Sequence, residues 1–138
     1  WKRADVPEGI AQPIKRAVPE PAHDLEWLLG EALTNLYVGL AREMRGERLS
    51  AMRFIQWYAV DRLLELANII EDAQSVNRDE FAAERRFEQR FPRFASQLPL
   101  WMQGYERNRE SALGILNFLE QHFPVNPALA EAIRSRCQ

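Results

Sequence analysis

The feature that most constrains this chain is segment 46–71, GERLSAMRFIQWYAVDRLLELANIIE, which predicts a helix that is apolar on most of its sides. At about 100° per residue, apolar side chains form one continuous stripe. The stripe holds Met52, Ile55, Ala59, Leu63, Leu66 and Ile70. Val60, Leu64 and Trp57 extend the apolar surface beyond half of the circumference. A helix with so wide an apolar surface belongs in the middle of a helical bundle.

One narrow sector of this helix remains polar, with Asp61, Glu65 and Asn68 beside Phe54 and Tyr58. Carboxylates on a buried helix are costly unless they are paired, hydrogen-bonded or hydrated. Two interpretations stay open: an internal ion-pair network, or a site in which the carboxylates and aromatic faces bind the ammonium groups of a ligand. The internal partners considered are Arg42, Arg53 and Arg109.

Helical spacing and capping residues predict an all-α fold. The chain has no segment of alternating apolar and polar residues long enough for a strand, and no Asn-Gly or Asp-Gly hairpin turn. Asp24, Ser50 and Asn126 are the expected N-caps, and Trp101 and Tyr105 are expected inner positions of the fourth helix. The predicted helices span about residues 24–45, 49–71, 79–90, 100–123 and 127–134. Short connections favour an antiparallel bundle of four to five helices.

The domain organisation follows from the prolines at positions 7, 13, 19 and 21, which predict an extended Pro-rich linker over residues 1–23. Residues 24–138 form the predicted helical bundle domain. Because the chain begins at Trp1 rather than Met, we expect it to be a fragment.

Composition excludes several classes of protein. A formal net charge of −2 argues against a general nucleic-acid binder. The single cysteine, Cys137, cannot form an internal disulfide. No apolar run approaches the roughly 18 residues of a membrane span, and no signal peptide is visible. We therefore expect a cytoplasmic protein with neither a nucleic-acid nor a membrane partner.

The first predicted helix carries a second row of polar side chains, since Glu31, Asn35 and Arg42 lie near one edge of its leucine stripe. The row is either a solvated boundary or the rim of a cleft in which Glu31 accepts a proton from a bound hydroxyl. His23 and His122 lack the spacing of metal ligands, and no phosphate-binding glycine loop is present, so no metal or cofactor site is expected in this chain.

Three runs, Glu31–Arg42 (EALTNLYVGLAR), Arg45-Gly46-Glu47 and Leu49–Leu66 (LSAMRFIQWYAVDRLLEL), carry a family resemblance. They resemble the C-terminal helical domain of antibiotic nucleotidyltransferases, the lincosamide and aminoglycoside adenylyltransferase group with a kanamycin-nucleotidyltransferase-like architecture. The resemblance covers about 100 residues, from Asp24 to Phe123. It implies a missing N-terminal α/β domain, whose Gly-Ser turn and Asp-x-Asp pair bind ATP and Mg²⁺.

The resemblance also implies a role for individual residues. Glu31 best matches the carboxylate base that some members carry on the first helix. Asn35, Tyr58, Asp61 and Glu65 are the predicted contacts to a small-molecule, aminosugar-like acceptor. This chain alone is predicted to be inactive. The alternative is a non-enzymatic helical module that binds another protein, a second copy of itself among the options.

Overall fold

The computed structural model describes residues 23–79, 82 and 84–138, and within these residues every regular element is a helix. The all-α prediction is confirmed for this part of the chain. The elements are α1 (Leu25–Met44), α2 (Arg48–Met52), the π-helix η2 (Arg53–Ala59), α3 (Val60–Ile70), α4 (Phe87–Arg90), α5 (Pro92–Ala95), α6 (Leu98–Trp101), α7 (Asn108–His122) and α8 (Pro127–Arg136). Residues 1–22, where the linker is predicted, lie outside the described residues.

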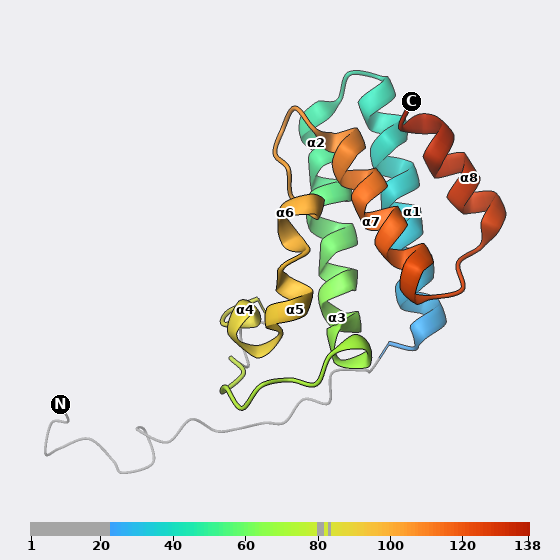
Figure 1. Cartoon of the computed structure of the whole chain (residues 1–138). Helices are drawn as coiled ribbons and strands as arrows, with labels where there is room; N and C mark the ends of the chain where they lie inside the picture. Colours follow the sequence, from blue (N-terminus) through green and yellow to red (C-terminus); the bar gives the residue numbers. More distant parts are fainter. Residues whose placement is uncertain (1–22, 80–81, 83) are drawn as a thin grey trace, which may run out of the picture.

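The first long helix, α1, contacts most of the other long elements, namely η2, α3, α7 and α8. At its end the chain reverses through Gly46, whose φ of +78° favours glycine. The continuous run α2–η2–α3 then passes back beside α1. On the other side of this run in the view of Figure 1, α6 lies above α5, and α4 lies next to α5. α7 and α8 complete the fold near the C-terminus.

The predicted apolar stripe of the central run forms its inner surface. Ile55, Ala59, Leu63 and Leu66 have no exposed surface. The approach of α1 is close enough that a Cβ added to Gly39 would lie 2.5 Å from Ile55 Cγ1. Trp57, however, is 56% exposed, so the run is apolar on its outer side without being covered there.

Two of the three predicted N-caps are confirmed. Asp24 Oδ1 accepts a hydrogen bond from the Trp27 amide at 2.7 Å, and Asn126 Oδ1 accepts from two amides at the start of α8. The prediction for Ser50 is wrong, because the helical run begins at Arg48 and Ser50 Oγ instead accepts a hydrogen bond from Arg42 Nη1 at 3.0 Å. That bond joins the central run to α1.

Two predicted helices are shorter than expected. The third, 79–90, is helical only over α4, although residues 80–81 and 83 lie outside the description. The fourth, 100–123, is interrupted between Trp101 and Asn108, where Gly104 has a φ of +95°. A left-handed residue cannot continue an α-helix. Tyr105 is therefore 47% exposed rather than an inner residue, whereas Trp101 is fully buried as predicted.

Candidate functional site

The five predicted site residues lie on two neighbouring elements, and we call them together the acceptor edge. Glu31 and Asn35 belong to α1 and are partly exposed. Tyr58 lies in η2 and is 44% exposed, and the exposed carboxylates Asp61 and Glu65 belong to α3. Helical spacing places Glu31 and Asn35 on one side of α1, and it places the other three residues on one side of the central run.

Contacts between α1 and the central run show that the two halves of the acceptor edge adjoin. Three contacts cross it: His23 Nδ1 to Glu65 Oε2 at 3.0 Å, the Arg62 guanidinium over the Trp27 ring at 5.5 Å, and the Arg42 guanidinium over the Phe54 ring at 4.7 Å. On α1, Glu31 and Asn35 lie between Trp27 and Arg42 in the sequence. On η2 and α3, Tyr58 and Asp61 lie between Phe54, which contacts Arg42, and Arg62, which contacts Trp27. The five residues therefore share one edge of the molecule.

Glu65 already has two side-chain partners within the described residues. Its Oε1 lies 3.0 Å from Arg62 Nη2, and its Oε2 lies 3.0 Å from His23 Nδ1. None of the three arginines considered from the sequence forms an observed ion pair with it: Arg42 binds Ser50 and Glu47, and Arg109 donates to the Gln138 carbonyl. The ion-pair partner of Glu65 is therefore Arg62, three residues earlier on the same helix. The sequence shows this spacing, which brings two side chains together on a helix.

Asp61, like Glu31, has no ion-pair partner among the described residues, whereas Glu65 has one. Burial raises its pKa above the usual value; Arg62 opposes this rise, and Glu84 and Glu65 add to it. No described residue donates a hydrogen bond to its side chain. A carboxylate in this setting gains from any cation that approaches it.

Aromatic rings form a wall beside these carboxylates. Phe54 and Tyr58 meet edge to face, with ring centroids 5.3 Å apart. Because Arg42 covers Phe54, Tyr58 is the ring left exposed to a ligand. The sequence-based pairing of aromatic and acidic side chains in one sector is therefore present, with Tyr58 and Asp61 as its accessible members.

Two hollows in the surface lie away from the acceptor edge, and no residue of the edge lines either. One, of about 470 Å³, is lined by Gly46, Glu47, Arg48, Leu49, Ser50, Arg53 and Tyr105. The other, of about 490 Å³, is lined by Ile69, Ile70, Glu71, Arg93, Phe94, Gln97, Phe118, Gln121, His122 and Phe123.

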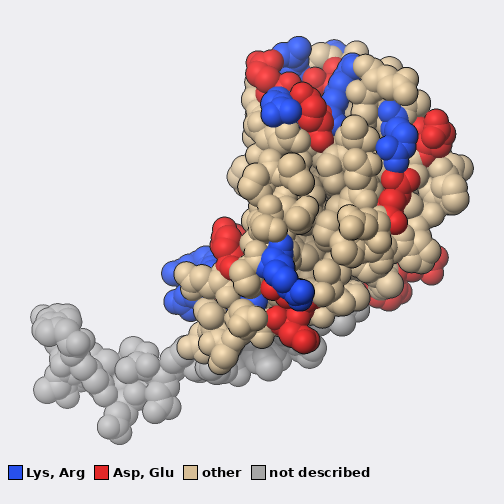
Figure 2. Space-filling view, in the orientation of Figure 1, with Lys and Arg blue, Asp and Glu red and all other residues tan. Residues whose placement is uncertain are grey.

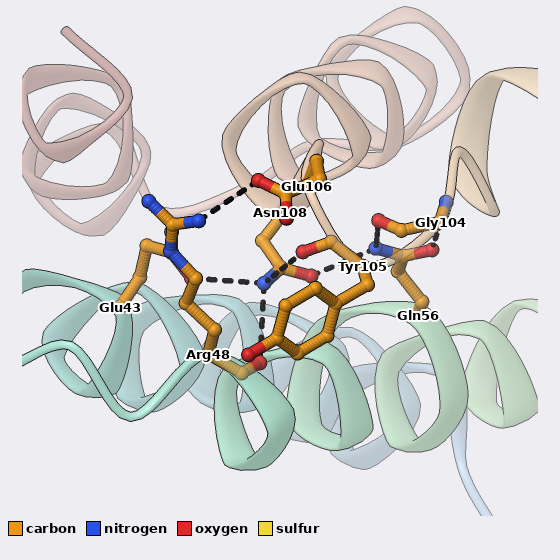
Figure 3. Close-up of polar contacts among 7 residues, drawn as sticks. All are labelled: Glu43, Arg48, Gln56, Gly104, Tyr105, Glu106 and Asn108. Carbon is orange, nitrogen blue, oxygen red and sulfur yellow. Dashed lines mark hydrogen bonds and ion pairs between the residues drawn. The ribbon is translucent and has the colours of Figure 1, made fainter.

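The sequence analysis missed a buried polar cluster that fastens the α6–α7 connection to the central run (Figure 3). Gln56, 1% exposed, points from η2 toward the connection. Its Oε1 accepts from the Gly104 amide at 2.9 Å, while its Nε2 donates to the Gly104 carbonyl and to Asn108 Oδ1, both at 2.8 Å. These bonds supply the partners that a helix would have given Gly104.

Asn108 continues the cluster toward α1. Its Nδ2 donates to Glu43 Oε2 at 2.8 Å and to the Arg48 and Tyr105 carbonyls. Arg48 in turn forms an ion pair with Glu106 at 2.8 Å. Since every amide group of Gln56 and Asn108 has a partner, the cluster has a structural role. A glutamine beside the apolar stripe was the sequence signal that could have revealed it.

Charge on the visible surface is mixed rather than of one sign. On the face shown in Figure 2, acidic and basic side chains lie close together at the two ends of the molecule and along its right side, and the middle of the face is largely uncharged. Among the described residues, no helix is long and apolar enough to cross a membrane. Those residues also contain no cluster of three or more His, Cys, Asp or Glu side chains that could hold a metal ion.

Comparisons with known proteins add no identification. No family model, no curated protein and no solved structure matches this chain. The geometry of the acceptor edge is therefore the structural basis for a functional argument.

Proposed function

We propose that this chain is the helical acceptor-binding domain of a cytoplasmic nucleotidyltransferase, which transfers AMP from ATP to a hydroxyl of a small, antibiotic-like molecule. In this proposal the helices form an antiparallel bundle preceded by a Pro-rich linker. The observation that carries it is the acceptor edge, where carboxylates and an exposed aromatic ring from α1, η2 and α3 lie side by side.

Each residue of the edge has a role in the proposal. Asp61, which no described residue hydrogen-bonds, is the first contact for an ammonium group, because a bound cation relieves its repulsion from Glu65 and Glu84. Tyr58 offers its exposed face to the same cation. Glu65 contributes only as far as a ligand competes with Arg62. On α1, Asn35 orients the acceptor and Glu31 removes the proton from its reacting hydroxyl.

Among residues 23–79, 82 and 84–138, no cluster of three or more His, Cys, Asp or Glu side chains could hold a catalytic magnesium ion. The proposal therefore assigns metal and nucleotide binding to a separate N-terminal domain. Purified alone, the chain should not transfer AMP with ATP and Mg²⁺. Magnesium-dependent labelling of an acceptor by the isolated chain would contradict this division of labour.

Calorimetric titration of the chain with kanamycin, and with lincomycin for comparison, tests acceptor binding directly. Asp61→Asn should weaken binding of the preferred compound by about tenfold or more, because it removes a charge-assisted contact. Glu88→Gln, which neutralises an exposed carboxylate on α4, is the matched control and should leave binding unchanged. Equal affinity of both variants and the wild type would refute the acceptor edge, as would the absence of binding by either compound.

The alternative, a helical module that binds another protein, has one observation in its favour. Large apolar side chains are exposed on the described surface, and they include Leu49, Trp57, Leu100, Met102 and Tyr105. The coding sequence before Trp1 separates the two functions: a Gly-Ser turn with an Asp-x-Asp pair supports the transferase, and a start codon close to Trp1 supports the module.

A further inference from the structure

The outer side of the central run carries a line of three side chains that shares only Asp61 with the acceptor edge. Arg53, Trp57 and Asp61 follow one another at four-residue spacing along η2 and the start of α3, and we call them the outer line. Four-residue spacing places side chains on one side of a helix. Trp57 is 56% exposed at the centre, and Arg53 and Asp61 are also exposed.

Neither charged end of the outer line has a hydrogen-bond or ion-pair partner among the residues that the structure describes. Among residues 23–79, 82 and 84–138, the Arg53 guanidinium forms no hydrogen bond or ion pair. Other exposed arginines in the described part of the chain do form ion pairs, as Arg45 does with Glu47 and Arg107 with Glu110. At the opposite end, no described side chain or amide donates to the Asp61 carboxylate. An unpaired cation and an unpaired anion thus flank an exposed indole.

We propose that the outer line is a dimer interface, on which a second copy of this chain packs with its central run antiparallel to the first. A two-fold axis through Trp57 brings the two indoles together. The same axis places Arg53, four residues before Trp57, opposite the partner's Asp61, four residues after the partner's Trp57. Symmetry repeats the pair, so each copy satisfies both unpaired charges of the other.

The chemistry of the line favours a second copy over an unrelated partner. Packed helix axes lie about 8–10 Å apart, a separation that an arginine and an aspartate side chain span together. Trp and Arg are the residue types that most often dominate interface energies. Leu49 and Tyr105, 66% and 47% exposed, flank Arg53 and line the hollow of about 470 Å³, which leaves space beside the guanidinium for a partner side chain. In an antiparallel pair, the positive end of the line faces the negative end of the second copy, and the two aromatic side chains face each other.

Sedimentation equilibrium of the full chain from about 1 µM to about 500 µM tests the interface. The wild type should form dimers that weaken as salt is added. Arg53→Asp and Asp61→Arg should each raise the dimer dissociation constant by about tenfold or more, because each places like charges opposite one another twice. The double variant, which reverses both charges, should recover the wild-type constant within about threefold.

The matched control is Arg86→Asp, which makes the same charge change on an exposed arginine before α4 and should leave the dimer unchanged. Melting curves verify that each variant is folded, and a folded double variant keeps the test decisive even if a single variant is unstable. A wild-type monomer throughout the concentration range would overturn the inference. So would a dimer that neither single variant weakens, or a double variant that stays as weak as the singles.

The inference does not rest on nucleotidyl transfer, and the two can fail separately. No acceptor is present in the sedimentation experiment, and Arg53 lies outside the acceptor edge. Arg53→Asp should therefore leave kanamycin or lincomycin binding by a monomeric sample intact. Loss of acceptor binding with an intact dimer would remove the proposed function alone, and the reverse result would remove the interface alone.

Discussion

Replacing Gln56 by leucine should destabilise the fold more than its similar volume suggests. The substitution removes three hydrogen bonds, two to Gly104 and one to Asn108 Oδ1, with lengths from 2.8 to 2.9 Å. The bond to Asn108 is buried, so its oxygen loses a partner that water cannot easily replace, whereas Gly104 is partly accessible. A buried unsatisfied group costs about 1–3 kcal/mol and each part-buried bond about 0.5–1.5 kcal/mol, giving an expected loss of about 2–6 kcal/mol.

Urea denaturation followed by far-UV circular dichroism measures this loss as a shift in midpoint. Gln103→Leu is a closely matched control, because Gln103 lies one residue before Gly104 and its side chain makes an exposed bond to the Leu100 carbonyl. The control should change the free energy of unfolding by less than about 0.5 kcal/mol. Hydrogen exchange at the Gly104 amide should become faster in Gln56→Leu but not in Gln103→Leu.

Equal stability of the two variants would refute the reasoning, since it would mean that the buried amide contributes nothing that an exposed one does not. If Gln56→Leu lowers the free energy of unfolding without faster hydrogen exchange at the Gly104 amide, the proposed role of Gln56 is also contradicted. In that case the destabilisation would come from packing around η2 rather than from the connection that Gln56 holds.

Leu63→Ala should lower the free energy of unfolding by about 2–5 kcal/mol, because Leu63 is fully buried, and the partly buried Leu64→Ala should cost clearly less. Asp61→Asn should raise the melting temperature of a dilute, monomeric sample at neutral pH. Burial raises the pKa of Asp61, so the folded state binds its proton more tightly and stability falls as pH rises through the window above the ordinary value of 3.8. The advantage of the asparagine should therefore disappear below that window, and a constant difference at all pH values would contradict it. In a form that includes the nucleotidyl-transfer domain, Glu31→Gln should lower kcat by about 10²–10⁴-fold in steady-state assays without lowering the melting temperature. Normal turnover by a stable variant would eliminate Glu31 as the base.

The sequence predicted those parts of the fold that depend on neighbours along the chain. The apolar period of residues 52–66 placed Ile55, Ala59, Leu63 and Leu66 in the core, because helical periodicity and burial share one cause. Asp24 and Asn126 cap their helices through bonds to amides two or three residues away. Such bonds are decided locally, and local patterns reveal them.

The interruption between α6 and α7 could not be predicted in the same way. Its cause is the side chain of Gln56, 48 residues earlier, which satisfies the backbone of Gly104 in a left-handed conformation. Helical spacing across residues 100–123 offered no warning, since Trp101 and Leu116 do occupy inner positions. Only the packed fold shows that a buried glutamine replaces the helical hydrogen bonds there.

The sequence predicted which residues belong to the acceptor edge, but it did not predict which of their charges are paired. Helical spacing predicted that Glu31 and Asn35 share one side of α1, and that Tyr58, Asp61 and Glu65 share one side of the central run. The packing of α1 against the central run brings these two groups together. The sequence could not show which carboxylate lacks a partner, because that depends on which cations the fold brings within reach. Arg62 and His23 satisfy Glu65, and Asp61 is left with the raised pKa.

The two proposals meet at Asp61, and their combination has a consequence that neither has alone. A cationic acceptor and the partner's Arg53 would both neutralise the same carboxylate, so each should weaken the other. Because linkage between binding equilibria is reciprocal and each dimer holds two acceptor sites, the factor by which a saturating acceptor raises the dimer dissociation constant must equal the square of the factor by which dimerisation raises the acceptor dissociation constant of each site. Arg53→Asp should therefore make acceptor affinity independent of protein concentration, whereas the wild type should bind acceptor more weakly as its concentration rises. An acceptor that leaves the dimer unchanged would mean that it approaches the edge from the α1 side, through Glu31 and Asn35, without reaching Asp61.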